Sequence, residues 1–270
     1  MTEKPGNPDN AQASHPPLSP EARATWGSTL IAAFSALISL VALGIGLYSA
    51  HLVEQQNSNS QQQALLSLVT DIQQGQQAPT STNENAISAE LAVLGEAEEA
   101  SNIINDIPRS GVSSAEKYIV GRALEDGDDY RPALDLLTGA AQQASDPRTA
   151  ADAWRGVAAI LYTLKSASQA EEDVNRAEES FSRPDVTTFS KRSNVAYTEL
   201  FDIPYRVFYD CPAAQEEWDD ASYLIQHNRD LLNGSNSTAA VMNAGTALVK
   251  TCHAPRGTLK EETLLKLISP

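Results

Sequence analysis

The distribution of apolar residues first marks a long uncharged segment near the start of the chain. No charged residue occurs from Ala24 to Val53, and the run 26–50 exceeds the roughly 20 apolar residues that a helix needs to cross a hydrocarbon core about 30 Å thick. A cleaved signal peptide has a shorter apolar region, and it has small residues before the cut where this chain has Leu47 or Tyr48. A buried core helix of this length would normally show a polar face, which this run lacks. We therefore predict an uncleaved transmembrane helix at residues 26–50.

Basic residues beside the predicted anchor indicate its orientation. Arg23 precedes the anchor directly, whereas the first Lys or Arg after it is Arg109. Because cytoplasmic flanks carry the excess of Lys and Arg, residues 1–25 are predicted to be cytoplasmic and the C-terminal domain extracytoplasmic. Ala42 and Gly46 have the spacing of small residues that packs transmembrane helices together, which leaves self-association as a homo-oligomer open.

Polar segments flank the predicted anchor on both sides. Residues 1–25 hold five of the fourteen prolines and are predicted to be a disordered, Pro-rich tail. Residues 51–84 are rich in Gln, Asn and Ser and are predicted to be a spacer. Leu65, Val69 and Ile72 lie at helical spacing, so a short helix is expected to interrupt this spacer.

From residue 85 to residue 270 the apolar positions follow a helical period, which predicts an all-α domain. Within it, the segment 114–184 matches itself after a shift of 37 residues. Repeats of about this length form stacked helical hairpins, so four helices in two pairs are expected. The matched positions are small residues, a leucine and prolines: Gly121 with Ala158, Leu124 with Leu161, Ala133 with Ala170, Ala140 with Ala177, and Pro147 with Pro184.

Capping residues predict where these four helices begin. Ser or Asp before a helix accepts a hydrogen bond from a free backbone N–H, and a Glu three residues later completes a capping box. Gly127 is predicted to end the first helix. The predicted N-caps are Ser113 with Glu116, Asp129, Asp146 before Pro147, and Ser168 with Glu171.

Specific residues recur in both units. The first unit has Val120-Gly121, then Gly127-Asp128-Asp129-Tyr130, then Ala133, Leu137 and Ala140; the second has Trp154, Val157-Ala158, Leu161, Ala170, Val174 and Ala177. Together they resemble the tetratricopeptide repeats, although each unit is longer than the usual 34 residues and the second lacks the Gly-Asp-Tyr turn. The resemblance covers roughly a quarter of the chain and implies a right-handed α-solenoid. A generic alanine-rich helical bundle is the alternative.

The resemblance also implies a binding surface. In tetratricopeptide repeats the first helix of each pair lines a concave groove, which suits an extended peptide or the tail of another protein. A solvated helix face is the alternative interpretation of the same residues. Carried over by position, the groove residues are Tyr118, Arg122, Glu125, Asp152, Arg155, Ala159 and Tyr162.

Past Pro184 the repeat weakens, and only single helices are predicted, at residues 212–232 and 239–251 and from Thr258 to about residue 268. Cys211 precedes the first of these helices and Cys252 follows the second, so an antiparallel pair would bring both sulfurs to one end. Outside the cytoplasm such cysteines form disulfides, and we predict a Cys211–Cys252 bond.

Two points qualify this pairing. With the predicted boundaries, the two helices differ in length by roughly 12 Å at 1.5 Å per residue, so one of these boundaries needs adjustment. The alternative is a metal site that adds His227 and His253 to the two cysteines, but their spacing matches no usual zinc pattern.

Composition narrows the functional classes. The net charge is −16, of which residues 1–25 contribute −1 (two basic against three acidic residues), leaving −15 for the rest. Such a surface repels nucleic acid, which we exclude as a partner, and it favours a basic or neutral protein. Frequent Ala and a preference for Arg over Lys are typical of GC-rich bacteria.

The sequence shows no nucleophile motif, phosphate-binding loop or metal-ligand spacing, so we expect no enzyme activity and no cofactor. The leading hypothesis is a single-pass, membrane-anchored module that binds a protein or peptide partner in the cell envelope. A self-associating envelope scaffold and a transmembrane signal transducer are the alternatives.

Overall fold

The structure is a computed structural model that describes residues 49, 56–76, 83–108, 111–228, 231–232, 235–255, 259 and 264–266. The chain divides into two compact units, Met1–Ser58 and Asn59–Pro270, and the architecture below is that of the second. Every regular element in the described part of this unit is a helix. A helix at residues 56–76 is followed by α2 (Asn83–Asp106), α3 (Ser114–Asp126), α4 (Tyr130–Gln143), α5 (Pro147–Thr163), α6 (Ala167–Glu179), α7 (Thr188–Arg206), α8 (Cys211–His227) and α9 (Ser235–Thr251).

The predicted membrane segment falls almost wholly outside this description. All of residues 26–50 except Ser49, and the whole of the predicted tail at 1–25, lie outside the described residues. Among the helices that are described, none has both the length and the apolar character needed to cross a bilayer. The anchor and its topology stay predictions.

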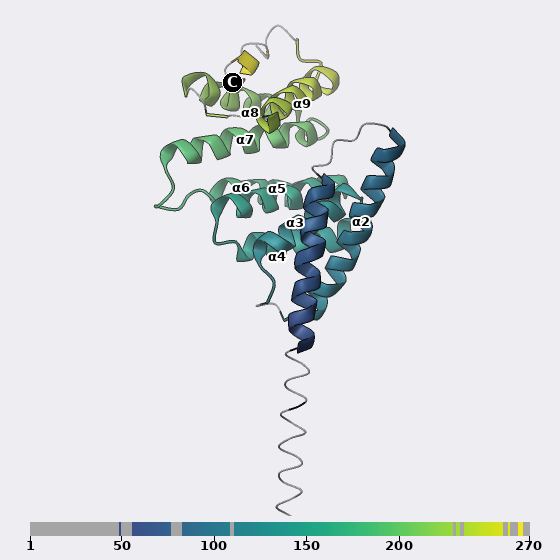
Figure 1. Cartoon of the computed structure of the whole chain (residues 1–270). Coiled ribbons are helices and arrows are strands. Elements are labelled where there is room, and N and C mark those ends of the chain that lie inside the picture. The colour runs from purple at the N-terminus through teal and green to yellow at the C-terminus, as the bar shows by residue number, and fades with distance from the viewer. Residues whose placement is uncertain are drawn as a thin grey trace, which may run out of the picture. The chain divides into compact units, whose positions relative to one another are not determined.

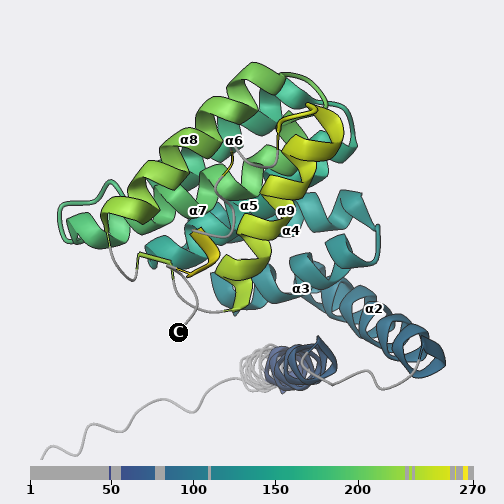
Figure 2. The ribbon, with the colours of Figure 1, turned by 90° about the horizontal axis from the view of Figure 1, so that it is seen from above.

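Consecutive helices pack as pairs that stack on one another (Figure 1). The pairs are α3 with α4, α5 with α6 and α7 with α8, and the first helices of successive pairs also contact each other. The repeat in segment 114–184 corresponds to the first two pairs. The third pair follows the same arrangement although its sequence shows no clear repeat. In both Figure 1 and Figure 2, α8 and α9 cover the side of α7 that faces away from α5 and α6.

The turns of the first two pairs have the same geometry. Asp128 and Lys165, 37 residues apart, both adopt left-handed backbone conformations, with φ of 63° and 61°. In each turn the next residue donates its N–H to a leucine carbonyl five residues earlier, at Leu124 (2.9 Å) and at Leu161 (2.8 Å). The second turn therefore repeats the first without a Gly-Asp-Tyr sequence.

Most of the predicted helix starts are present. Ser113 accepts a hydrogen bond from the Glu116 N–H (3.2 Å), and the Glu116 carboxylate accepts one from the Ser113 N–H (2.7 Å), which completes the capping box. Asp146 accepts from the Thr149 N–H at 2.8 Å. The predicted Ser168 cap is wrong: α6 begins at Ala167, because the left-handed turn reverses the chain two residues earlier than expected.

Small residues lie where the helices approach closely. A Cβ atom added at Gly121 would be 2.9 Å from the Leu137 Cγ atom, so α3 and α4 meet at a distance that only glycine permits. At the corresponding places in the second pair, Ala158 and Ala170 are fully buried against each other's helices. The repeated small residues therefore set the spacing within each pair.

Residues 51–84 are more structured than a spacer interrupted by a short helix. The helix at 56–76 is long, and Leu65, Val69 and Ile72 are buried in the same core as Ala97 and Ala100 of α2. Because these three residues lie on one helical face, burying them against α2 removes a continuous apolar stripe from water. The folded unit therefore begins before residue 85.

The disulfide between Cys211 and Cys252 is confirmed, with the two Cα atoms 5.6 Å apart. The predicted length mismatch disappears because α8 ends at His227 and α9 begins at Ser235, which makes both helices 17 residues long. The bond joins the start of α8 to the end of α9. Since both sulfurs are bonded to each other, the alternative metal site is wrong.

The two largest apolar cores lie on either side of a polar layer between α5 and α7, formed by the buried residues Arg155, Asn194, Thr198 and Asp202. One core extends from the helix at 56–76 to α5, and the other is formed by α7, α8, α9 and the terminal residues Leu259 and Leu264. The Trp218 indole N–H donates to the Leu259 carbonyl at 3.2 Å and ties the terminal segment to α8. Of the terminal helix predicted from Thr258, only residue 259 and residues 264–266 are described, and they are helical.

Candidate functional site

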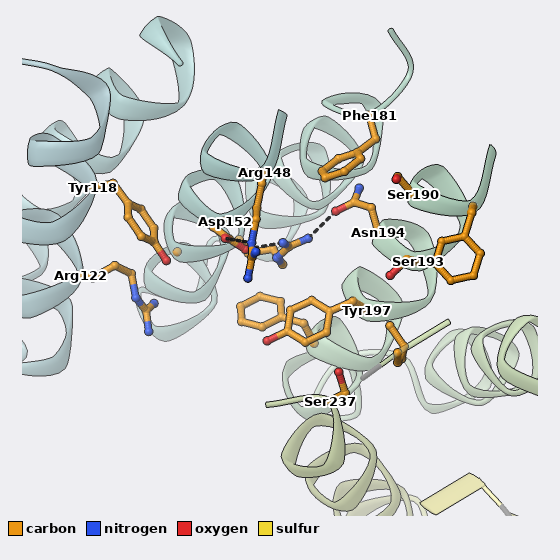
Figure 3. Close-up of a pocket in the computed structure, with 15 residues that line it drawn as sticks. Tyr118, Arg122, Arg148, Asp152, Phe181, Ser190, Ser193, Asn194, Tyr197 and Ser237 are labelled. Carbon is orange, nitrogen blue, oxygen red and sulfur yellow. Dashed lines mark hydrogen bonds and ion pairs between the residues drawn. The ribbon is translucent and has the colours of Figure 1, made fainter. Parts of the chain in front are cut away.

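A cavity of about 640 Å³ opens between α3, α5 and α7, and we call it the groove. Its volume lies within the range of pockets that bind ligands. Figure 3 shows Tyr118 and Arg122 on one wall, Arg148 and Asp152 in the centre, and Asn194 and Tyr197 on the opposite wall. The remaining lining residues are Arg155, Gly156, Phe181, Phe189, Ser190, Ser193, Phe201, Leu232 and Ser237.

Arg155 forms the floor of the groove and is fixed by partners on two helices. Its side chain is only 7% exposed, and it donates to the Asn194 amide oxygen (2.9 Å) and the Thr198 hydroxyl (2.6 Å) on α7. On its own helix it pairs with Asp152. The guanidinium also lies over the Tyr197 ring, 5.0 Å from its centroid, in a cation–π contact. Arg155 therefore links α5 to α7 and holds both walls in place.

The other two arginines of the groove are more accessible. Arg148 is 84% exposed and lies 3.9 Å from the Asp152 carboxylate, so this pair is weak. Arg122 is one-third exposed and pairs with Glu125 at 2.5 Å and Asp126 at 3.6 Å. The groove therefore contains a net positive lining within a chain of charge −16.

Burial changes the ionisation of Glu125 behind this wall. Its side chain is 13% exposed, and burial raises its pKa to about 7, although the positive charge of Arg122 opposes this rise. Burial likewise raises the pKa of Tyr118, whose hydroxyl stays neutral at physiological pH. The charge of the α3 wall therefore increases as the pH falls through 7 and Glu125 takes up a proton.

The structure brings four of the seven predicted groove residues together. Tyr118, Arg122, Asp152 and Arg155 all line the cavity. Glu125 lies behind them, where it pairs with Arg122.

Ala159 and Tyr162, by contrast, are 4% exposed and do not line the groove. Both lie further along α5, where α7 packs against it, and Tyr162 stacks on Tyr205 with ring centroids 5.4 Å apart. The third helical pair, α7 with α8, covers this part of α5, which a solenoid of only two pairs would leave exposed.

The sequence pattern does not identify the wall contributed by α7. Asn194, Tyr197 and Phe201 belong to the segment past Pro184, where the repeat is no longer visible. The available signal is the unusual density of aromatic residues between Phe189 and Tyr209. Aromatic residues that are grouped on one helix without a matching repeat indicate either a core face or a binding face.

A second, smaller cavity of about 350 Å³ adjoins the groove along α7. Tyr197 and Phe201 line both cavities, so the two share a wall. The smaller cavity is otherwise lined by Leu200, Pro204, Tyr205, Ala239, Ala240 and Asn243 and is mainly apolar. A bound segment that follows α7 would thus meet a charged region first and an apolar region next.

In the part of the chain that the structure describes, no group of three or more His, Cys, Asp or Glu side chains is arranged to hold a metal ion.

Comparison with known proteins adds no assignment: no family model matches the chain, and neither does any curated protein or solved structure. The resemblance to the tetratricopeptide repeats therefore depends on the residues and the stacked helical pairs alone.

Proposed function

We propose that residues 59–270 form a protein-binding module of the tetratricopeptide-like type, which holds an extended segment of a partner protein in the groove. The observation that carries this proposal is the groove itself, in which exposed Arg148 and aromatic rings surround a floor fixed by buried Arg155. Arginine and aromatic side chains are the residues that contribute most to protein interfaces. The apolar cavity beside Tyr197 and Phe201 would receive an apolar side chain of the same segment.

The groove and the body of the protein favour different features of the partner. The excess of negative charge over the whole chain attracts a basic or neutral protein at long range. Inside the groove, Arg122, Arg148 and Arg155 face only Asp152 among the lining carboxylates. We therefore propose a basic or neutral partner whose bound segment itself carries acidic side chains and at least one large apolar side chain.

The predicted anchor at residues 26–50 would hold this module at the outer face of a cell membrane. The Cys211–Cys252 disulfide supports an extracytoplasmic location, because disulfides persist in oxidising compartments and are rare in the cytosol. Cysteine introduced at Ser60 tests the topology. A thiol reagent that cannot cross membranes should label this cysteine in intact cells. Labelling that occurs only after the cells are lysed would refute the orientation.

Site-specific photo-cross-linking tests the binding role. A photoreactive phenylalanine analogue at Phe189, which lines the groove and is 49% exposed, should cross-link to another protein in intact membranes. The same analogue at Tyr223 is the matched control, because Tyr223 is an exposed aromatic residue of α8 that does not line the groove. Cross-links at Phe189 only to a second copy of the chain would favour the scaffold instead.

A pair of charge reversals adds specificity. Arg148→Glu in the groove should lower the cross-linking yield about fivefold or more, as expected for an interface arginine worth over 1 kcal/mol. Arg131→Glu, at an exposed position on α4, should leave the yield unchanged. Equal effects of the two substitutions would show that long-range charge, and not the groove, determines binding.

A further inference from the structure

Three carboxyl side chains of α7 and α8 form what we call the acidic cluster: Glu199, Asp202 and Glu217. Asp202 is fully buried, and the Glu217 side chain is 17% exposed. One carboxyl oxygen of each of the three is buried and has no hydrogen-bond partner among the residues that the structure describes. Ionising these carboxyl groups is costly, because water is excluded and few donors replace it.

Arg206 pairs with two of the three carboxyl groups of this cluster. The Arg206 Nε atom lies 2.9 Å from Asp202 Oδ2 and 3.1 Å from Glu217 Oε1. One of its terminal nitrogens lies 3.6 Å from the Glu171 carboxylate on α6. One positive charge therefore faces a carboxyl group from each of three helices. If Glu171, Asp202 and Glu217 were all ionised, the single charge of Arg206 would leave two negative charges without compensation.

The side chains around the acidic cluster include more carboxyl groups than positively charged groups. From α9 no charge reaches the cluster, since the one charged residue of that helix, Lys250, is exposed in its last turn. Arg155 is already paired with Asp152. The other titratable or charged groups that face the cluster are Tyr162 and Arg155 from α5, Glu171 and Glu178 from α6, Tyr205 from α7, and Asp220 from α8.

Ionisation behaves as this geometry implies. Burial raises the pKa of Glu199 to about 8, and the nearby carboxylates Glu178 and Asp220 act in the same direction. Burial also raises the pKa of Glu217 to about 9, again with help from a neighbouring acid, Asp202. Both glutamates are therefore mainly protonated at pH 7 in the folded protein, whereas in an unfolded chain they would be ionised.

We propose that protons held by Glu199 and Glu217 keep α7 packed against α6 and α8, so that this junction acts as a pH-sensitive element which loosens when alkaline conditions remove those protons. α7 also supplies Asn194 and Tyr197 to the groove. Loosening of α7 therefore disturbs the groove, and the protein responds to the pH outside the membrane if the proposed topology holds.

The direction of the effect follows from the raised pKa values. A group whose pKa is higher in the folded state contributes stability that is complete below its unfolded pKa and is lost as the pH rises through its folded pKa. For Glu199 and Glu217 the loss begins at the ordinary pKa of 4.5 and continues to about pH 8 and about pH 9, so the range from pH 6 to pH 9 covers its larger part. Each proton changes the unfolding equilibrium constant up to tenfold per pH unit across this window.

Urea unfolding of the full-length protein in detergent at pH 6, 7, 8 and 9 tests this proposal. The main variant is Glu199→Gln with Glu217→Gln, because glutamine imitates the protonated acid. The control is Glu179→Gln, at an exposed position on α6. Wild type and control should lose stability steeply from pH 6 to 9. The double variant should show a much flatter dependence and should exceed the wild type in stability at pH 9.

Hydrogen exchange measured by mass spectrometry locates the effect. Amides of α7 should exchange at least tenfold faster at pH 9 than expected from intrinsic chemistry alone, whereas those of α4 should not. An identical pH slope in the wild type and the double variant would overturn the proposal. If the double variant does not fold, titration of the carboxyl carbons of the wild type by NMR tests the proposal instead. The absence of any Glu with a pKa above 7 would then overturn it. Neither measurement uses a partner, so the groove proposal stands or fails separately.

Discussion

Replacing Arg155 by methionine is the most direct test of the polar layer. Methionine keeps a long, flexible, apolar side chain but removes the guanidinium that joins Asp152 to Asn194 and Thr198. Removing one partner of a buried ion pair costs about 3–5 kcal/mol. Because Asp152 is 29% exposed, water can solvate it partly, and we expect a loss at the lower limit, about 3 kcal/mol.

Arg148→Met is the matched control, since Arg148 faces the same Asp152 but is 84% exposed and 3.9 Å away. An exposed pair of this kind contributes up to about 0.5 kcal/mol. Urea unfolding followed by circular dichroism measures both losses. In thermal unfolding, a 3 kcal/mol loss corresponds to a fall in Tm of roughly 6–12 °C for a domain of this size. A loss below 1 kcal/mol for Arg155→Met, or equal losses for both variants, would refute the role assigned to Arg155.

Two further predictions concern the packing of the helical pairs. Replacing Cys211 and Cys252 by serine should lower the free energy of unfolding by about 4 kcal/mol, from the loop entropy at a separation of 41 residues, and reduction of the wild type should have the same effect in urea titrations. A loss below 1 kcal/mol would contradict this. Gly121→Ala should destabilise, because overpacking against Leu137 costs about 1–3 kcal/mol and exceeds the gain in helix propensity of about 1 kcal/mol. In a Leu137→Ala background the same change should stabilise, and an unchanged sign there would disprove the steric explanation.

Sequence patterns predicted the parts of this fold that depend on neighbours along the chain. The 37-residue repeat and the Ser113 and Asp146 caps follow from local spacing. The Cys211–Cys252 bond was predicted for a similar reason, since two adjacent helices bring their outer ends together. Each of these features requires knowledge of one or two helices only.

The missed features depend on contacts between distant segments. The helix at 56–76 has an apolar stripe of only two turns, formed by Leu65, Leu68, Val69 and Ile72. Its burial depends on contact with α2, which the polar composition of this segment does not indicate. The α7 wall of the groove requires a third helical pair that shows no sequence repeat. That same pair covers Ala159 and Tyr162, so two predicted groove residues became packing residues.

Arg155 illustrates the difference most clearly. Its position on the first helix of a pair predicted a contact with a ligand, and the structure does place it in the groove. Its main interactions, however, are with Asn194 and Thr198, about 40 residues later in the chain. An arginine on a polar helix face has the same sequence signature whether it binds a partner or its own protein.

The bond between Cys211 and Cys252 also determines how the protein would respond to a mechanical pull. Tension applied to the C-terminal end would reach residue 252 and cross the covalent bond directly to residue 211 and then α7. The covalent path would bypass the 40 residues between the two cysteines, which include most of α8 and all of α9. A machine that unthreads polypeptides from this end would therefore have to reduce the bond or pass a closed loop before it could extract these helices.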